Sequence, residues 1–349
     1  MNAQVEVVAL GARTPVGLSA ESSAAAVRAG ISRYAEYPFI NARGEPLVVA
    51  ADRLLEPKLE GRERLVPMVE SVLEEIEAKL GHKVLYVGSL RVLLALPETR
   101  PGFSESDAKW VADSLAARFR TKTSSARVEI AGRGHAGAIQ AVEHVLRECS
   151  ESRDNLFLVV GVDSYHHTET FTWLERGRRF KQPGIRSGFT PGEGAGCLVL
   201  MSAGLRRHLQ LPQLAVVRGA CTAQEQLLRD SETGSFGAAM TQAVQGVVKG
   251  LDLSREGVDT LYADINGERY RSEEWGFVAL RAPPIWKSPG YKSPSDCWGD
   301  VGAAFGVLGS ILAVRSFARG YAQGPRALVM AGSDHGLRGV MLLQAPQMS

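Results

Sequence analysis

The sequence predicts an α/β fold on three observations. Short apolar segments with strand character alternate with amphipathic helical segments along the chain, which is the pattern of a sheet covered by helices. The order of strand, helix and glycine-rich helix in the first half recurs in the second, which indicates an internal duplication with its seam near 205–212. Residues 302–317 are apolar or small almost all round, which is typical of a helix buried between two sheet layers.

Strands are predicted where apolar and β-branched residues run together between turn residues. Such runs occupy 5–12, 92–96, 127–130, 155–162 and 197–201 in the first half, and 214–219, 260–265, 327–331 and 339–344 in the second. Helices are predicted where apolar residues recur every three to four positions. The segments are 19–29, 65–80, 106–119, 135–149, 236–249 and 302–317.

Composition and charge exclude several classes of protein. Of 349 residues, 45% are hydrophobic, and 40 Lys and Arg balance 38 Asp and Glu, so neither disorder nor a dedicated nucleic-acid binder is expected. The longest uncharged apolar stretch, 301–314, is too short to span a membrane. No basic segment precedes the first apolar run, as a signal peptide would require. We therefore expect a cytoplasmic protein without a nucleic-acid or membrane partner.

The residue types that bind metals are poorly placed for it. The four cysteines, Cys149, Cys197, Cys221 and Cys297, include no C-x-x-C pair, so neither a zinc site nor a disulfide framework is expected. The adjacent side chains of His166 and His167 point apart on an extended chain, which makes them a weak pair of ligands. We expect no metal and no cofactor.

The most specific motif is FTPGEGAGCLVLM at 189–201. It resembles the F-x-P-G-E-G-A-G-x-x-V-L segment of β-ketoacyl synthases, which are members of the thiolase superfamily. Further segments resemble the ketosynthase opening strand and helix, the turn that carries the nucleophile, and the two histidine motifs. In order they are VALGARTPVGLSAESSAAAVRAGIS, ARVEIAGRGHAGAIQAVEHVL, DINGERYRSEEW and KSPSDCWGDVGAAFGVLGSILAV.

The resemblance implies a fold and an assembly. Proteins of this kind have a thiolase-like five-layer αβαβα fold made of two pseudo-symmetric halves, which here would be residues 1–205 and 206–349. They usually form homodimers, so a homodimer is expected.

The family chemistry is not expected to transfer. Ketosynthases use a Cys thiolate at a helix N-terminus, where the helix dipole favours the anion, and two His residues assist decarboxylation and condensation. Alignment anchored on the neighbouring motifs places Gly132 at the Cys position, Glu268 at the first His and Gly299 at the second. None of these residues can perform the reaction, which implies a pseudoenzyme.

A few residues remain as candidates for other chemistry. His135 and Cys297 are the fallback catalytic candidates, and Arg133 at the turn is a candidate for binding an anion at the helix N-terminus. Arg269 and Asp300 are binding candidates in two charged loops that, by resemblance, face the former active site. These loops hold Glu268, Arg269, Arg271, Glu273 and Glu274, and Asp296 and Asp300. The charged runs 62–64 and 176–181 are interpreted as solvated faces or loops.

Three hypotheses about function stay open. The first is a catalytically inactive, ketosynthase-like protein that acts by binding another protein. It resembles the degenerate thiolase-like proteins encoded beside bacterial type VI secretion effectors and their adaptors, which implies a chaperone or adaptor role. The second is an active acyltransferase or ketosynthase-type enzyme that uses relocated catalytic residues on coenzyme A or acyl-carrier-protein thioesters. The third is a non-catalytic partner of an active synthase subunit, similar to a chain-length factor.

Overall fold

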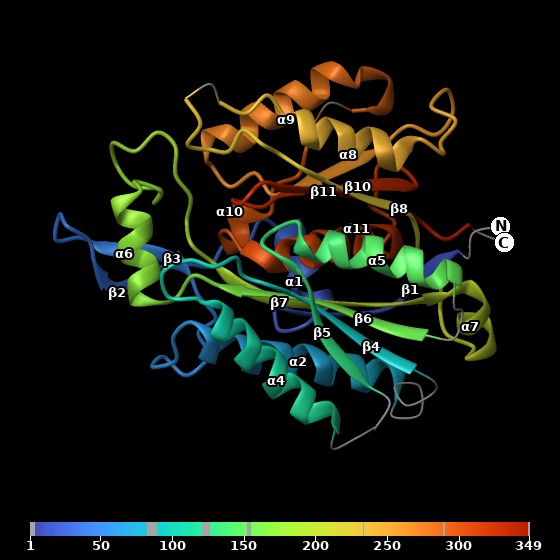
Figure 1. Cartoon of the computed structure of the whole chain (residues 1–349), viewed down its shortest axis with the longest axis horizontal. Coiled ribbons are helices and arrows are strands. Elements are labelled where there is room, and N and C mark those ends of the chain that lie inside the picture. The colour runs from blue at the N-terminus through green and yellow to red at the C-terminus, as the bar shows by residue number, and fades with distance from the viewer. Residues whose placement is uncertain are drawn as a thin grey trace.

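The computed structural model describes residues 4–81, 89–120, 126–151, 155–232, 234–288 and 290–347. Five layers of helices and sheet lie over one another (Figure 1). The outer helices of the first half are α2 (Arg62–Leu80) and α4 (Glu105–Arg120), and those of the second are α8 (Ala238–Val248) and α9 (Arg269–Arg281). Between the sheets lie α1 (Ala20–Arg28), α5 (Gly137–Glu151) and α11 (Phe305–Ala318).

Nine of the strands in the described residues form one sheet in the order β5-β4-β6-β7-β1-β8-β11-β10-β9. Among the described residues, the halves of the sheet are joined where three residues of β1 pair with three of β8, and the sheet folds over at this seam to give the two sheet layers. The strands of the first half are β1 (Val5–Arg13), β4 (Ser89–Leu96), β5 (Arg127–Arg133), β6 (Asn155–Ser164) and β7 (Glu193–Ser202). Those of the second half are β8 (Ala215–Gln224), β9 (Thr260–Ala263), β10 (Arg326–Gly332) and β11 (Leu337–Gln344).

The strand order repeats between the two halves. The series β4-β6-β7-β1 has the same arrangement as β9-β10-β11-β8, and in both the outer members are parallel. The first half continues with β5, whereas in the described part of the second half only the backbone of Lys292 hydrogen-bonds to that edge of β9. The predicted boundary at 205/206 falls in the short helix α7 (Ala203–His208), and the division into two halves stays a prediction.

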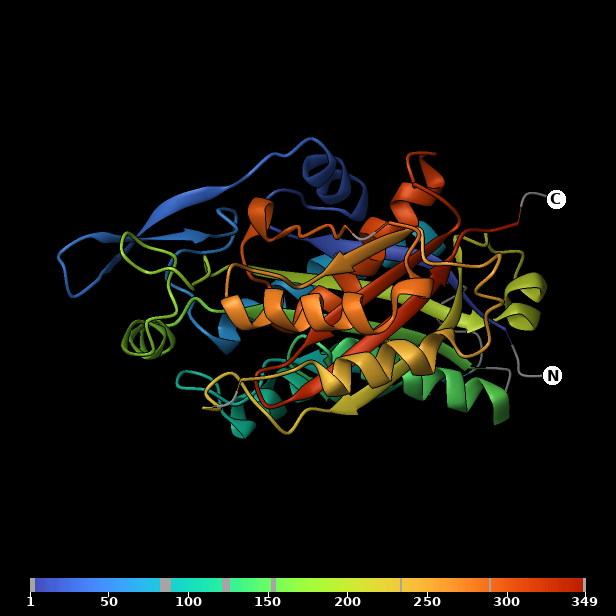
Figure 2. The ribbon, with the colours of Figure 1, turned by 90° about the horizontal axis from the view of Figure 1, so that it is seen from above.

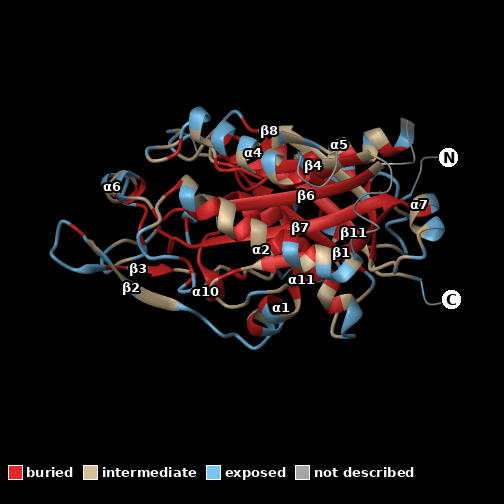
Figure 3. Ribbon diagram, turned by 90° about the horizontal axis from the view of Figure 1, so that it is seen from below, coloured by how far each residue is buried: buried red, intermediate tan, exposed pale blue. Residues whose placement is uncertain are grey.

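Three hydrophobic cores separate the layers, and the buried strands and central helices dominate the interior (Figure 3). The central core contains α5 and α11, which contact strands of both halves. The predicted helix 302–317 is confirmed as one turn of 3-10 helix, η2 (Gly302–Ala304), followed by α11. Its small residues allow close packing, since a Cβ on Gly306 would lie 3.1 Å from the Cβ of Ala138.

Some elements were not expected from the sequence. A hairpin of β2 (Tyr34–Ile40) and β3 (Pro46–Ala50) extends from one end of the molecule and packs beside α6 (Thr168–Arg176) through an apolar cluster (Figure 2). The charged segment expected to be a loop after 260–265 forms helix α9 instead, because Trp275 and Val278 bury one of its faces. The remaining short elements are η1 (Pro283–Ile285) and α10 (Ser295–Trp298). Among the described helices, none combines the length and the apolar character needed to cross a membrane.

Candidate functional site

The turn from β5 into α5 places His135 at the centre of the molecule. The turn requires glycine at Gly134, whose φ is +66° and where a Cβ would come within 2.7 Å of the Ser333 hydroxyl. Its amide donates to the carbonyl of Leu96 at the end of β4, which fixes the turn on the neighbouring strand. The residue His135 is 4% exposed, so the polar atoms of its side chain depend on partners within the protein.

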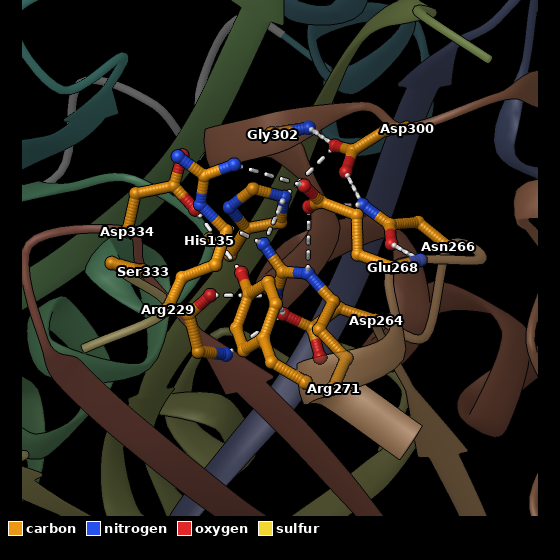
Figure 4. Close-up of polar contacts among 12 residues, drawn as sticks. His135, Arg229, Asp264, Asn266, Glu268, Arg271, Asp300, Gly302, Ser333 and Asp334 are labelled. Carbon is orange, nitrogen blue, oxygen red and sulfur yellow. Dashed lines mark hydrogen bonds and ion pairs between the residues drawn. The ribbon is translucent and has the colours of Figure 1, made fainter. Parts of the chain in front are cut away.

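The carboxylate of Asp300 is the main partner of His135 (Figure 4). Nε2 of His135 lies 2.8 Å from Oδ1 of Asp300, and because an ionised carboxylate only accepts, Nε2 carries the hydrogen. The same carboxylate accepts from the Gly302 amide at 2.8 Å and from Nδ2 of Asn266 at 2.5 Å. Asp300 is 3% exposed, and the side chains of His135, Asp300 and the partly buried Asn266 form a hydrogen-bonded chain.

The electrostatics of this pair favour the charged forms. Burial alone would lower the pKa of His135, but the carboxylate of Asp300 outweighs it, so the pKa is raised. Burial would raise the pKa of Asp300, but His135 and Arg271 hold it well below its usual range. Both shifts show that His135 and Asp300 stabilise one another as an ion pair when the imidazole is protonated.

Further ion pairs lie around the His135–Asp300 pair. The Arg271 guanidinium donates to Asp264 at 2.5 Å and lies 3.5 Å from Nε2 of His135. Arg179 binds both oxygens of Glu268, at 2.7 and 2.8 Å, and donates to Asp334 at 2.6 Å. We call the full set the His135 cluster, and it comprises His135, Arg179, Asp264, Asn266, Glu268, Arg271, Asp300 and Asp334. Its four carboxylates outnumber its two guanidiniums, which explains why His135 favours its proton.

One side of the His135 cluster borders a cavity of about 260 Å³. His135, Arg179 and Asp334 line it together with side chains from four other segments, among them Arg100, Tyr165, Trp173 and Arg229. Among the described residues, no hydrogen-bond partner reaches Nδ1 of His135, which is buried. A buried imidazole nitrogen without a partner costs free energy. Nδ1 of His135 is therefore free to form one more hydrogen bond, for example with a ligand.

The three positions expected to replace the catalytic residues do not share a site. Gly132 lies within β5, where a Cβ would come within 2.2 Å of the Gly137 carbonyl, so it serves the close packing of strand and helix. Glu268 belongs to the cluster through Arg179. Gly299 has φ +73° and packs on the backbone of Thr190. The side chains that meet are instead those of His135, Asn266 and Asp300. Each lies within three residues of the position that the alignment had assigned.

Of the other predicted candidates, some belong to the His135 cluster and the rest lie elsewhere. Asp300 and the fallback residue His135 come together, whereas Arg133 pairs with Glu105 and Arg269 pairs with the exposed Glu273. Cys297 does not line the cavity at His135 but a separate one, and burial raises the pKa of its thiol. Within the described chain, no three His, Cys, Asp or Glu side chains are grouped so as to hold a metal ion.

The motif at 189–201 has a structural role. Its Glu193 is fully buried and accepts two hydrogen bonds of 2.7 Å from Arg64, one from the Asp52 amide and one from the Ser164 hydroxyl. Burial would raise the pKa of Glu193, but His166 and Arg64 hold it well below its usual range. The expectation that 62–64 is a solvated face is therefore wrong for Arg64, which is 3% exposed.

Sequence reasoning missed half of the His135 cluster, namely Arg179, Asp264, Asn266 and Asp334. Arg179 was assigned to a solvated run, yet it is 4% exposed because Glu268 and Asp334 neutralise it and Trp173 and Phe189 stack on it. Asp264 and Asp334 follow β9 and β10, which are parallel neighbours. Carboxylates placed just after two adjacent parallel strands lie at the same end of the sheet. This placement is the sequence pattern from which a site at Asp264 and Asp334 could have been predicted.

Comparison with known proteins supports the fold. No protein family matches the chain, and no curated protein does. Among solved structures, a type II polyketide acyl-carrier protein in complex with its ketosynthase bound to the hexaketide gives a TM-score of 0.80 at 15% identity, covering 99% of this chain and 100% of that one. The ishigamide ketosynthase/chain length factor gives the same values. The module 6 ketosynthase of the bacillaene synthase from Bacillus subtilis 168 gives a TM-score of 0.77 at 13% identity, covering 99% and 72%.

These similarities confirm the predicted α/β fold. The chain has the thiolase-like fold of ketosynthases, with the five layers that Figure 1 shows. At such low identity the similarity establishes the fold alone, and the residues of the site decide what the fold is used for.

Proposed function

We propose that this protein is a ketosynthase-fold pseudoenzyme that forms no acyl-enzyme and acts by binding another protein. The observation that carries the proposal is the His135–Asp300–Asn266 hydrogen-bonded chain, in which His135 lies at the turn into α5 and both His135 and Asp300 are buried. By resemblance, this strand-to-helix turn is where a ketosynthase presents its nucleophile. Here the turn presents an imidazole that is committed to a carboxylate.

The cysteines do not replace the missing nucleophile. All four are free, and none lines the cavity at His135. Burial raises the pKa of each thiol, to about 11 for Cys149, so the thiolate that attacks a thioester is disfavoured. Ser333 lies near the turn, but its hydroxyl accepts from the Ala136 amide and donates to the Arg133 carbonyl.

The edge of the sheet supports a role in binding. In the described chain β5 pairs only with β4, so its other edge presents unpaired backbone groups, and Ile130 on this strand is 36% exposed. Such an edge is a template for strand addition by another chain. We propose that a second protein chain pairs there, which in a homodimer would be another copy of β5.

The class of partner is a finer proposal. Two of the similar structures contain a carrier protein or pair a ketosynthase with a chain length factor, which favours a synthase subunit as partner. The resemblance to degenerate thiolase-like proteins favours a type VI secretion effector or its adaptor. Affinity purification from the native host separates these proposals, because the first predicts a Cys-bearing synthase or carrier protein and the second a toxin with its adaptor.

An enzymatic role is the second candidate, and the His135–Asp300 pair favours it. A histidine bonded to a buried carboxylate can act as a general base through its other nitrogen. Such an enzyme would release thiol from acetyl-CoA or malonyl-CoA, would lose this activity in His135→Gln, and would keep it in Cys297→Ala.

Steady-state thiol release tests the two functions against each other. The proposed pseudoenzyme releases no thiol above the rate of free thioester, with an active ketosynthase as positive control. Turnover that disappears in His135→Gln would establish the enzymatic role and overturn the proposal.

A further inference from the structure

A pair of cavities lies between α1 and the C-terminal end of α11, and no residue of the His135 cluster lines either of them. Two adjoining cavities of about 540 and 380 Å³ share Ala24, Arg28 and Tyr321 as lining residues. Figure 3 shows α1, α10 and α11 on the same side of the molecule. We call these cavities together the α1–α11 groove.

The larger cavity is rich in guanidinium groups. Arg28, Arg315 and Arg319 line it around the ring of Tyr321. Burial raises the pKa of the Tyr321 hydroxyl, and the positive charges of the three arginines oppose that rise. The guanidinium of Arg28 lies 4.2 Å from the centre of the Tyr321 ring, so stacking holds it in place.

These charges are not neutralised by the acidic lining. The carboxylate of Glu21 is shared by Arg315, at 3.0 Å, and Lys79, at 2.8 Å. Among the described residues, no carboxylate lies within ion-pair distance of Arg28 or Arg319. The larger cavity therefore carries a positive charge that is available to an anion.

The smaller cavity contains a cation in a fixed position. The backbone of Lys292 is held on β9 by hydrogen bonds to Leu261 and Ala263, and its ammonium lies 5.5 Å from the centre of the Tyr262 ring. Burial lowers the pKa of Lys292, and no described carboxylate pairs with it, although Asp296 lines the same cavity. Burial has removed part of the hydration of this ammonium, and no counter-ion within the described part of the chain replaces it. An anionic ligand would provide that counter-ion.

The rest of the smaller cavity is largely apolar. Val27, Leu312 and Pro294 line it together with the rings of Tyr262 and Tyr321. A pocket with apolar walls and a few fixed polar groups is the usual environment of a small-molecule ligand. The groove thus joins an apolar chamber to a cluster of arginines.

We propose that the α1–α11 groove binds an organic phosphate with an aromatic or apolar body. The phosphate lies among Arg28, Arg315 and Arg319, because planar guanidiniums donate paired hydrogen bonds to phosphate oxygens. The body occupies the smaller cavity against Tyr262 and Tyr321, with Lys292 beside it. The proposal concerns binding only and does not depend on the loss of acyl transfer at His135.

Isothermal titration calorimetry with AMP as the probe tests the proposal. We expect Arg319→Gln, an exposed position whose change leaves the fold intact, to weaken AMP binding by about tenfold, since a hydrogen bond to a charged group contributes about that much. Lys292→Gln is expected to weaken it in the same direction. Arg255→Gln is the matched control, because this arginine is 86% exposed and lies outside the groove.

Two further titrations separate the parts of the ligand. Adenosine, which lacks the phosphate, is expected to bind at least tenfold more weakly than AMP, and inorganic phosphate, which lacks the body, is also expected to bind more weakly. The proposal is overturned if AMP does not bind at millimolar concentration, if adenosine binds as tightly as AMP, or if Arg319→Gln and the control bind AMP equally.

Discussion

The His135 cluster and the cluster around Glu193 both hold charges in the interior, but they balance them differently. A single carboxylate, that of Glu193, receives hydrogen bonds from Arg64, the Asp52 amide and Ser164, with His166 alongside. In the His135 cluster four carboxylates compete for two guanidiniums and one imidazole, and one side borders a cavity. Each cluster has a buried imidazole nitrogen without a partner among the described residues.

This difference separates a structural role from a site. Glu193 connects β7 to the chain after β3, to α2 and to the end of β6, so its contacts serve the packing of the first half. The His135 cluster draws its residues from the ends of several strands, where loops meet and ligands bind in open α/β sheets. Changes at Glu193 should therefore affect stability most, whereas changes in the His135 cluster should also affect pH dependence.

The largest expected effect is at the Glu193 cluster. Arg64→Met removes the bidentate partner and leaves the Glu193 carboxylate buried with too few donors. The free energy of unfolding should fall by about 3–5 kcal/mol, the usual cost of breaking a buried ion pair. Urea denaturation followed by circular dichroism measures this change, and a loss below about 1 kcal/mol would show that Glu193 is neutral in the fold.

The next effect is at Asp300. Asp300→Asn keeps the shape of the side chain but removes the charge that binds His135. Both oxygens of Asp300 accept hydrogen bonds, and the amide NH₂ that replaces one of them can only donate. The free energy of unfolding should fall by roughly 1.5–3 kcal/mol, as for a lost hydrogen bond to a charged group. The same urea titration measures it, with Asp296→Asn, an exposed position nearby, as the matched control. Equal stability of the two variants would argue against the His135–Asp300 ion pair.

A smaller effect is expected in the pH dependence. The pKa of His135 is raised in the folded protein, so its contribution is fully present below the unfolded pKa of about 6.5 and is lost as pH rises through the folded value. The difference in unfolding free energy between wild type and His135→Gln should therefore shrink as pH rises above about 6.5. Asp300, Arg271, Asp264 and Asp334 all influence this titration. A difference that grows with pH would have the wrong sign.

The smallest effect is expected at Arg269, which the sequence proposed as a binding residue. Its side chain is 79% exposed and pairs with Glu273 one helical turn away. Arg269→Ala should change the free energy of unfolding by no more than about 0.5 kcal/mol, because exposed ion pairs contribute little. A loss of several kcal/mol would place this residue in the cluster after all.

The sequence predicted the fold better than the site. The buried strands and the helix at 302–317 were predictable because their apolar patterns are continuous and local. The hairpin β2–β3 was missed because Pro38 lies within β2, and proline is disfavoured inside a strand, and because no residue of β2 is fully buried. Helix α9 was read as a loop because its charged residues mask the buried Trp275 and Val278.

The site was predicted only in part because its contacts are long-range. His135 and Asp300 were both candidates, but nothing in the sequence joins residues 165 positions apart. Arg179 and Asp334 carry charges that usually face solvent, and only the fold shows that they neutralise one another. The alignment of the Cys position and of the second His position rests on small residues, Ala131 and 302–304, and such residues can shift by a few positions without changing a local pattern. The alignment of the first His position rests on Ile265 and Asn266 alone.

The central claim is that the protein forms no acyl-enzyme. Intact-protein mass spectrometry after incubation with acetyl-CoA or malonyl-CoA tests it most directly, with Cys297→Ala measured alongside. The account predicts an unchanged mass for both proteins. A stoichiometric acyl adduct on the wild type would contradict it, and loss of that adduct in Cys297→Ala would identify Cys297 as the nucleophile.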